Sequence, residues 1–202
     1  MKKKFLSLSI VFVLLLAMLP VPASASVSGF EDVSPDDYFA TAVQWAVSWG
    51  VTQGTSETTF SPELICTRGQ VVTFLWRAHG EPEPSTGVNP FEDVPEGSYY
   101  DRATLWAVEQ GITNGMDETH FAPDATVTRA QTVTFLYRFA KAHTAAAKVF
   151  SDVALDAWYA EAVTWAAEND ITRGTSDTTF SPDDHCVRAQ IVTFLYRYMG
   201  GE

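Results

Sequence analysis

The sequence predicts an all-α protein built from three helix–loop–helix units. The first observation is repetition, because the segment Phe30–Val33 recurs 61 residues later at Phe91–Val94 and, with one change, 59 residues further on at Phe150–Val153. The second is a helical spacing of apolar residues within each unit, without an alternating strand of useful length. Two helices alone make a poor core, so the three units are expected to pack on one another.

The first predicted helix of each unit follows a short polar turn and has one apolar face. In the first copy this face consists of Phe39, Ala42, Val43 and Ala46. A loop with Gly, Phe and Pro at fixed positions follows, and the Phe and Pro are expected to pin this loop to the core.

The residue after this helix is expected to adopt the left-handed conformation that ends many helices. Gly50 and Gly111 suit this position because glycine has no Cβ atom. The third copy has Asp170 there, which is expected to cost a little stability.

The second predicted helix of each unit begins with a capping motif. Thr67 followed three residues later by Gln70 predicts a capping box, in which each side chain accepts a hydrogen bond from the other residue's backbone N–H. Thr128 repeats the motif, whereas Val187 in the third copy lacks the hydroxyl. Arg77 lies near the end of the same helix, where positive charge is favourable.

Residues 1–25 have the features of a secretory signal peptide: lysines at the start, an apolar run over 8–19, and small residues that end at Ala25. The run is short for a membrane span, and an uncleaved N-terminal anchor is the alternative. The rest of the chain is expected to form repeats over 26–80, 89–140 and 148–202, joined by linkers over 81–88 and 141–147. The second linker is rich in alanine and is expected to extend the preceding helix.

The charge of the chain is strongly acidic. Its net charge is −12, and without the three lysines of residues 1–25 it has 10 basic and 25 acidic side chains, a net charge of −15. Such a chain repels nucleic acid and anionic membrane surfaces, so neither is an expected partner. An anionic ligand would have to be held by a local basic site.

An arginine stands at the first position of every second helix. Positive charge is disfavoured there because the helix N-terminus is itself electropositive. One interpretation is an anion site, in which free backbone N–H groups and a guanidinium converge on a carboxylate or phosphate. The other is an ion pair with the aspartate that opens each repeat. The arginines are Arg68, Arg129 and Arg188, and the aspartates are Asp32, Asp93 and Asp152.

Other repeated residues are candidates for the same site, each with a structural alternative. The tryptophans of the first helices would stack on a sugar ring or, more commonly, lie in the core. The aspartates would accept sugar hydroxyls or bind backbone N–H groups. A loop glycine would let a ligand approach the backbone or supply a positive φ angle. These tryptophans are Trp45, Trp106 and Trp165, and the glycines are Gly54, Gly115 and Gly174.

Nothing in the sequence predicts catalysis, a cofactor or a metal site. The four histidines fall at unrelated positions of the repeat, and no Gly-x-Ser-x-Gly, His-Glu-x-x-His or phosphate-loop motif occurs. The two cysteines, Cys66 and Cys186, are expected to be small buried side chains, with a single disulfide as the alternative.

The ordered motifs of each unit resemble the S-layer homology (SLH) repeat. They are Phe-x-Asp-Val, an aromatic pair such as Trp158-Tyr159, Ala-Val-x-Trp-Ala, Gly-Ile/Val-Thr-x-Gly, Phe-x-Pro and Thr-Arg-Ala-Gln. The resemblance covers nearly the whole chain after residue 25. It implies a pseudo-threefold spindle of helices around a central bundle. It also implies grooves between repeats that bind secondary cell-wall polysaccharide, often through a pyruvate ketal on N-acetylmannosamine.

The resemblance implies the site residues as well. The arginine of the last motif is the family's main anion contact, and the opening aspartate and the first-helix tryptophan form and support the groove. Many family members have Glu in place of the glutamine, Ala in place of Gly69 and Thr in place of Val187. The three grooves therefore need not bind a ligand equally well. The groove with Arg188 is expected to be the least competent of them. The implied ligand-binding set is Arg68, Arg129, Arg188, Asp32, Asp93, Asp152, Trp45, Trp106, Trp165, Gln70, Gln131, Gln190, Gly54, Gly115 and Gly174.

These features together predict a non-catalytic anchor in a bacterial cell wall, which binds a secondary cell-wall polysaccharide or a peptidoglycan-linked glycan. A surface protein is a further expected partner. Because family members usually carry a separate cargo region, the chain is expected to be an anchor-only adaptor or a truncated product. The alternatives are a self-assembling or adaptor surface-layer protein and, more remotely, a wall glycan hydrolase.

Overall fold

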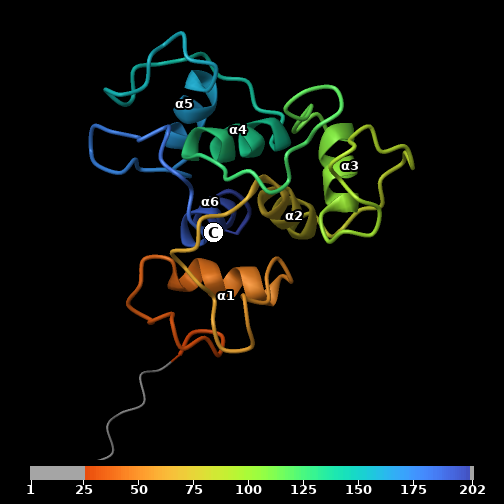
Figure 1. The fold of residues 1–202 in the computed structure, drawn as a ribbon. Helices are drawn as coiled ribbons and strands as arrows, with labels where there is room; N and C mark the ends of the chain where they lie inside the picture. Colours follow the sequence, from red (N-terminus) through yellow and green to blue (C-terminus); the bar gives the residue numbers. More distant parts are fainter. Residues whose placement is uncertain (1–25, 201–202) are drawn as a thin grey trace, which may run out of the picture.

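The computed structural model describes residues 26–200, which contain six α-helices (Figure 1). Outside the helices, regular backbone pairing in this part of the chain is limited to isolated bridges. The all-α prediction is therefore confirmed. The helices are α1 (Ala40–Ser48), α2 (Arg68–Ala78), α3 (Asp101–Glu109), α4 (Arg129–Phe139), α5 (Ala160–Glu168) and α6 (Arg188–Met199).

The second helices of the three repeats, α2, α4 and α6, pack against one another as a central bundle (Figure 1). Two of the outer helices pack on the central helix of the preceding repeat, α3 on α2 and α5 on α4. The third, α1, packs on α6. The first repeat therefore closes on the last, and the array is a ring, the predicted pseudo-threefold spindle.

The axis of the central bundle is filled by apolar side chains. Leu75, Leu136 and Leu195 occupy equivalent positions in the three helices and are almost completely buried. The void that remains between the helices measures only about 10 Å³. This is a packed core with no room for a ligand.

The capping motifs predicted for the central helices are present. In α2, Thr67 Oγ1 accepts a hydrogen bond from Gln70 N at 3.4 Å, and Gln70 Oε1 accepts one from Thr67 N at 3.0 Å. The same two bonds occur in α4. In α6, Gln190 Oε1 accepts a bond from Val187 N at 3.3 Å, but valine offers no hydroxyl. Gln190 N instead donates to the carbonyl oxygen of Val187 at 3.0 Å.

The outer helices end as the sequence predicts. Gly50 and Gly111 both have a φ of +71°, and Asp170 holds the equivalent position at +56°. The third repeat therefore places a residue with a Cβ atom in the left-handed region, where glycine is favoured.

Three short segments that precede the central helices meet at the pseudo-threefold axis. Cys66 N donates to Cys186 O at 3.1 Å, Val127 N to Cys66 O at 3.0 Å, and Cys186 N to Val127 O at 2.9 Å. This ring of backbone hydrogen bonds joins all three repeats. Both thiols are free and buried, and burial raises the pKa of Cys66 to about 11 and that of Cys186 to about 12.

The expectation that the alanine-rich linker extends α4 is wrong. Lys141 has a φ of +49°, and Ala142 N donates to Tyr137 O at 3.2 Å, which turns the chain away from the helix axis. Further along, Ala147 N donates to the hydroxyl of Thr164 in α5 at 3.0 Å. Contacts with the next repeat thus override the helix propensity of alanine.

The proposed signal peptide, residues 1–25, lies outside the described residues. Among residues 26–200, no helix is both long enough and apolar enough to cross a lipid bilayer.

Candidate functional site

Each predicted arginine reaches from its own repeat into the next one. Arg68, the first residue of α2, lies over the rings of Phe121 and Phe135, with 4.8 Å and 5.3 Å between its Cζ atom and the ring centroids. Its Nε atom donates to the carbonyl oxygen of Phe121 at 2.9 Å. The equivalent rings are Phe180 and Phe194 for Arg129, and Phe60 and Phe74 for Arg188. Because Phe60 belongs to the first repeat, the three junctions form a closed cycle.

The expectation that free helix N–H groups help to bind an anion is wrong. Arg68 N donates to Ala125 O, and Gly69 N donates to Pro123 O, both at 2.9 Å. Loop carbonyls of the next repeat accept the same bonds at the starts of α4 and α6. The helix N-termini therefore join one repeat to the next, and the guanidinium is the group left for a ligand.

The alternative interpretation, an ion pair with the opening aspartate, is not supported either. The carboxylate of Asp32 accepts hydrogen bonds from Phe60 N at 2.8 Å and Ser61 N at 2.7 Å, within its own repeat. Asp93 and Asp152 bind the equivalent N–H groups. Among residues 26–200, no acidic side chain forms an ion pair with any of the three arginines.

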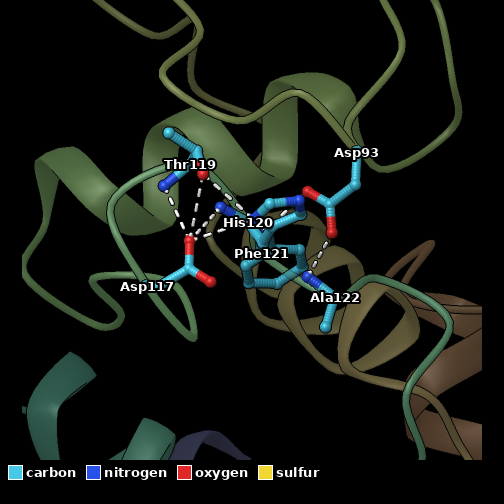
Figure 2. A network of polar contacts seen from close by, with 6 residues as sticks. All are labelled: Asp93, Asp117, Thr119, His120, Phe121 and Ala122. Carbon is cyan, nitrogen blue, oxygen red and sulfur yellow. Dashed lines mark hydrogen bonds and ion pairs between the residues drawn. The ribbon is translucent and has the colours of Figure 1, made fainter.

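The second copy of this aspartate clamp is seen in Figure 2, where the Asp93 carboxylate accepts bonds from Phe121 N at 2.8 Å and Ala122 N at 2.7 Å. Ala122 has a φ of +58°, a conformation that residues with a Cβ atom adopt reluctantly. The carboxylate thus fixes the turn that carries Phe121, the ring on which Arg68 lies. Asp93 therefore supports the site through the loop.

The same loop contains an acid–base pair that the other repeats lack. The Asp117 carboxylate accepts bonds from the backbone N–H groups of Thr119 and His120, both at 2.8 Å, and lies 3.1 Å from His120 Nδ1 (Figure 2). The backbone bond from Thr119 is the main cause that lowers the pKa of Asp117. The side-chain bond to Asp117 raises the pKa of His120.

The three guanidinium groups are buried without an ion-pair partner among residues 26–200. Arg68, Arg129 and Arg188 are only 4%, 3% and 4% exposed, and desolvation lowers the pKa of each. One nitrogen of each is buried and has no hydrogen-bond partner among the described residues: Nη2 in Arg68 and Arg129, and Nε in Arg188. Burial of an unpaired charge is costly. An anion that reached these nitrogen atoms would stabilise the arrangement.

A pocket of about 320 Å³ opens at Arg188, in the groove that the departure at Val187 had led us to expect to be the least competent of the three. The loop of the first repeat contributes Thr52, Gln53 and Gly54 to its lining, and the second repeat contributes Tyr99. The remaining lining residues are Gln70, Thr73, Phe74 and Arg77 of α2. Residues from all three repeats therefore meet in one groove.

The tryptophans of the outer helices lie in the core, the commoner of the two interpretations. Trp45, Trp106 and Trp165 are 8%, 2% and 8% exposed. Trp165 packs edge-on against Tyr137 and Tyr198, with 5.7 Å between ring centroids in both pairs. These rings support the repeat junctions and are not available to stack on a sugar.

Three of the aromatic residues that the structure exposes recur at the same position of each repeat and are not among the predicted site residues. They are Tyr38, Tyr99 and Trp158, the first members of the repeated aromatic pairs, and they are 65%, 56% and 64% exposed. Each packs edge-on against the second member of its pair. The sequence feature that could have identified them is an aromatic residue that recurs in all three repeats outside the apolar face of the first helix.

The predicted glycines and glutamines have structural roles in the loops and helix caps. Gly54 has a φ of +86°, and a Cβ atom there would lie 2.5 Å from Thr59 O and 2.6 Å from the ring of Phe30. Gly115 and Gly174 are confined in the same way. The glutamines use their amide oxygens in the helix caps. Gly54 and Gln70 also line the pocket at Arg188.

Comparison with known families gives three matches to the S-layer homology domain, at residues 29–72, 90–133 and 149–192. The chain belongs to the S-layer homology domain family. Each match begins at or just before the opening Phe of a repeat and ends within a central helix. All three arginines thus fall inside SLH domains.

Several curated proteins are similar to this SLH chain. The Surface-layer 125 kDa protein of Lysinibacillus sphaericus is 34% identical over 120 residues, which cover 59% of this chain and 10% of that protein. An endoglucanase of Bacillus sp. (strain KSM-635) is 32% identical over 136 residues, 64% of this chain and 14% of the enzyme. A cellulosome-anchoring protein of Acetivibrio thermocellus is 25% identical over 147 residues, 68% of this chain and 33% of that protein. The chain thus spans a third or less of each relative's length.

Proposed function

We propose that this protein is a non-catalytic anchoring module that binds an anionic secondary cell-wall polysaccharide at the bacterial surface. One observation carries the proposal: at corresponding positions of the three repeat junctions a guanidinium group is buried without an ion-pair partner among the described residues, each with an unpartnered nitrogen. An acidic glycan would supply the missing charge, whereas a neutral one would not. The overall charge of −12 repels anions, so selectivity has to come from these local sites.

The mode of binding follows from how each arginine is held. Two phenylalanine rings fix the guanidinium plane, so little side-chain entropy is lost when an anion binds. An exposed aromatic residue, such as Tyr99 at the rim of the pocket, offers a face for a sugar ring. Three such grooves on one polymer would give avidity without a tight single site.

The similar proteins support a surface location. One is a surface-layer protein and another is a cellulosome-anchoring protein. Residues 1–25 would direct export as a signal peptide, which agrees with a ligand in the wall. The pyruvate ketal that the SLH resemblance suggests carries a carboxylate, the type of anion that a buried guanidinium would bind.

The test is retention of the protein of residues 26–202 on wall sacculi that keep or lack their secondary polysaccharide, and on sacculi treated with mild acid to remove ketals. We expect retention by intact sacculi alone and its loss in the R68Q/R129Q/R188Q variant. Because these arginines also join repeats, circular dichroism must show that the variant is folded. If the variant is unfolded, the test is whether released polysaccharide prevents the native protein from binding to sacculi. Equal retention on stripped and intact sacculi would refute the proposal.

The likeness to a surface-layer protein favours a second candidate, a self-assembling or adaptor structural protein. Light scattering of the mature chain separates the two, because a strict monomer that still binds sacculi excludes self-assembly. A wall glycan hydrolase is a weaker candidate, since the chain covers only 14% of the similar endoglucanase. Release of reducing sugar from sacculi would support it.

A further inference from the structure

The three grooves differ at a second arginine, the last residue of the repeated segment. Arg138 Nη1 donates to Ile112 O, and Arg197 Nη1 donates to Ile171 O, both at 3.2 Å. Among the described residues, Arg77 makes no such bond to the equivalent residue, Val51. It lies instead 3.7 Å from Glu81, which is 54% exposed, so this ion pair is weak.

The same groove differs at its buried arginine. Arg68 and Arg129 donate through Nε to loop carbonyl oxygens. Arg188 turns its guanidinium so that Nη2 donates to the Thr52 hydroxyl and Nε is left unpartnered. Both departures from the threefold pattern therefore occur at the pocket of about 320 Å³, which both Arg77 and Arg188 line.

The charge inside this pocket is unusual for the chain. Its lining includes two arginines and no acidic residue, although the protein has 25 acidic side chains and 13 basic ones. A second pocket of about 310 Å³, beside the first linker, is lined by Glu83, Glu96 and Asp101 with a single arginine. Burial is the main cause that lowers the pKa of Arg188; the neighbouring Cys66 opposes this shift, and Arg77 adds a smaller lowering. An anion between the two cations would relieve both effects.

We propose that the groove at Arg188 is the primary ligand site of this chain and that Arg77 is a second anion contact in it. The ligand is an acidic sugar unit whose carboxylate or phosphate is shared by the two guanidinium groups, with its ring against Tyr99. This inference rests on the proposed function and assigns unequal roles to the three grooves. The pocket volume is at the lower end of the range for small-ligand sites, which suits a single sugar unit.

The test compares R77Q with the matched variants R138Q and R197Q by calorimetric titration. The probes are the methyl glycoside of pyruvylated N-acetylmannosamine and N-acetylmannosamine 6-phosphate, which distinguish a carboxylate from a phosphate. We expect R77Q to weaken binding of the preferred probe about tenfold, the loss of one charged hydrogen bond. R77K should retain most of the affinity. R138Q and R197Q should change affinity less than twofold while lowering the melting temperature, because a carbonyl group loses its partner.

The possible outcomes separate this inference from the proposed function. If the native protein binds neither sacculi nor either probe, the proposed function fails. If it binds a probe and R77Q behaves like R138Q, the function stands and the role of Arg77 is refuted. Equal losses of affinity in R68Q, R129Q and R188Q would refute a primary groove. Melting curves of each variant exclude unfolding as the cause.

Discussion

At the residue scale, the arginine junctions depend on small groups around them that fix the loops. The aspartates at the start of each repeat do not touch the guanidinium groups but hold the turns that carry the phenylalanine rings. The aspartates therefore have a structural role in the loops, and their contact with a ligand stays a prediction. Their removal would disturb the arginines indirectly.

Asp170 is the residue with the clearest local strain. We expect D170G to raise the free energy of unfolding by about 0.5 kcal/mol, because glycine accepts the left-handed φ but gains freedom in the unfolded chain. The weak contact between Asp170 and Arg173, at 3.7 Å, would be lost at little cost. Urea denaturation measures the difference.

The matched control for this change is G50D. A Cβ atom at Gly50 would meet no atom within 4 Å, so any loss of stability there is conformational and not a clash. It should destabilise the protein by a similar amount. Unchanged midpoints in both variants would show that this position carries no strain.

His120 predicts a pH dependence. Its pKa is raised by the bond to Asp117, so the charged imidazolium is favoured in the folded state. The resulting stability is fully present below the unfolded pKa of about 6.5 and is lost as the pH rises through the folded pKa. An NMR titration should give a pKa for His120 above its ordinary value, and D117N should bring it back. The same titration curve in both proteins would contradict the assignment.

At the element scale, the starts of the central helices perform two tasks. Their side-chain caps stabilise the helix, and their next N–H groups bind the loop of the neighbouring repeat. Helix formation and the docking of repeats are thus coupled, because the N–H groups of the first turn bind partly to the helix's own cap and partly to the loop of the next repeat. The one incomplete cap lies in α6.

We expect V187T to stabilise the protein by about 1 kcal/mol, because it supplies the missing hydroxyl to Gln190 N. The substitution is close in size, so packing should change little. Thermal unfolding followed by circular dichroism measures the effect. The reciprocal changes T67V and T128V should each lower stability by about the same amount, and a neutral V187T together with neutral controls would contradict the capping role.

At the scale of the whole molecule, ring closure makes the two ends of the chain interdependent. The helix α1 has no central helix before it in sequence and packs on α6, the last one. The backbone ring through Cys66, Val127 and Cys186 ties the same repeats together at the axis. We therefore expect cooperative unfolding, unlike the gradual behaviour of open repeat arrays.

The substitution W45A tests this closure, because the ring of Trp45 packs against Tyr196 of α6 with 5.9 Å between centroids. It should destabilise the protein by about 3–5 kcal/mol. Fluorescence and far-UV circular dichroism should still give coincident urea transitions. W49A is the matched control, because Trp49, the residue that follows α1, is 61% exposed and its loss should change stability by only about 0.5 kcal/mol. Separate transitions in W45A would show that α1 unfolds independently.

The sequence alone determined the elements, because helix periodicity, the Thr–Gln caps and the glycine ends are local properties that repeat three times. It also located the three arginines, since a positive charge at a helix start has no local explanation. Residues with two plausible roles could not be assigned in this way. The tryptophans were one such case, because the same aromatic side chain suits both a buried core position and stacking on a sugar ring.

Only the tertiary structure decided which groups remain free to bind a ligand. The first N–H groups of the central helices donate to loops more than 50 residues away in sequence, and the alanine-rich linker is turned aside by α5. The pocket at Arg188 needs residues from the first, second and third repeats, which meet only when the ring closes. No local pattern contains that information, because the contacts arise from packing between repeats that share one set of motifs.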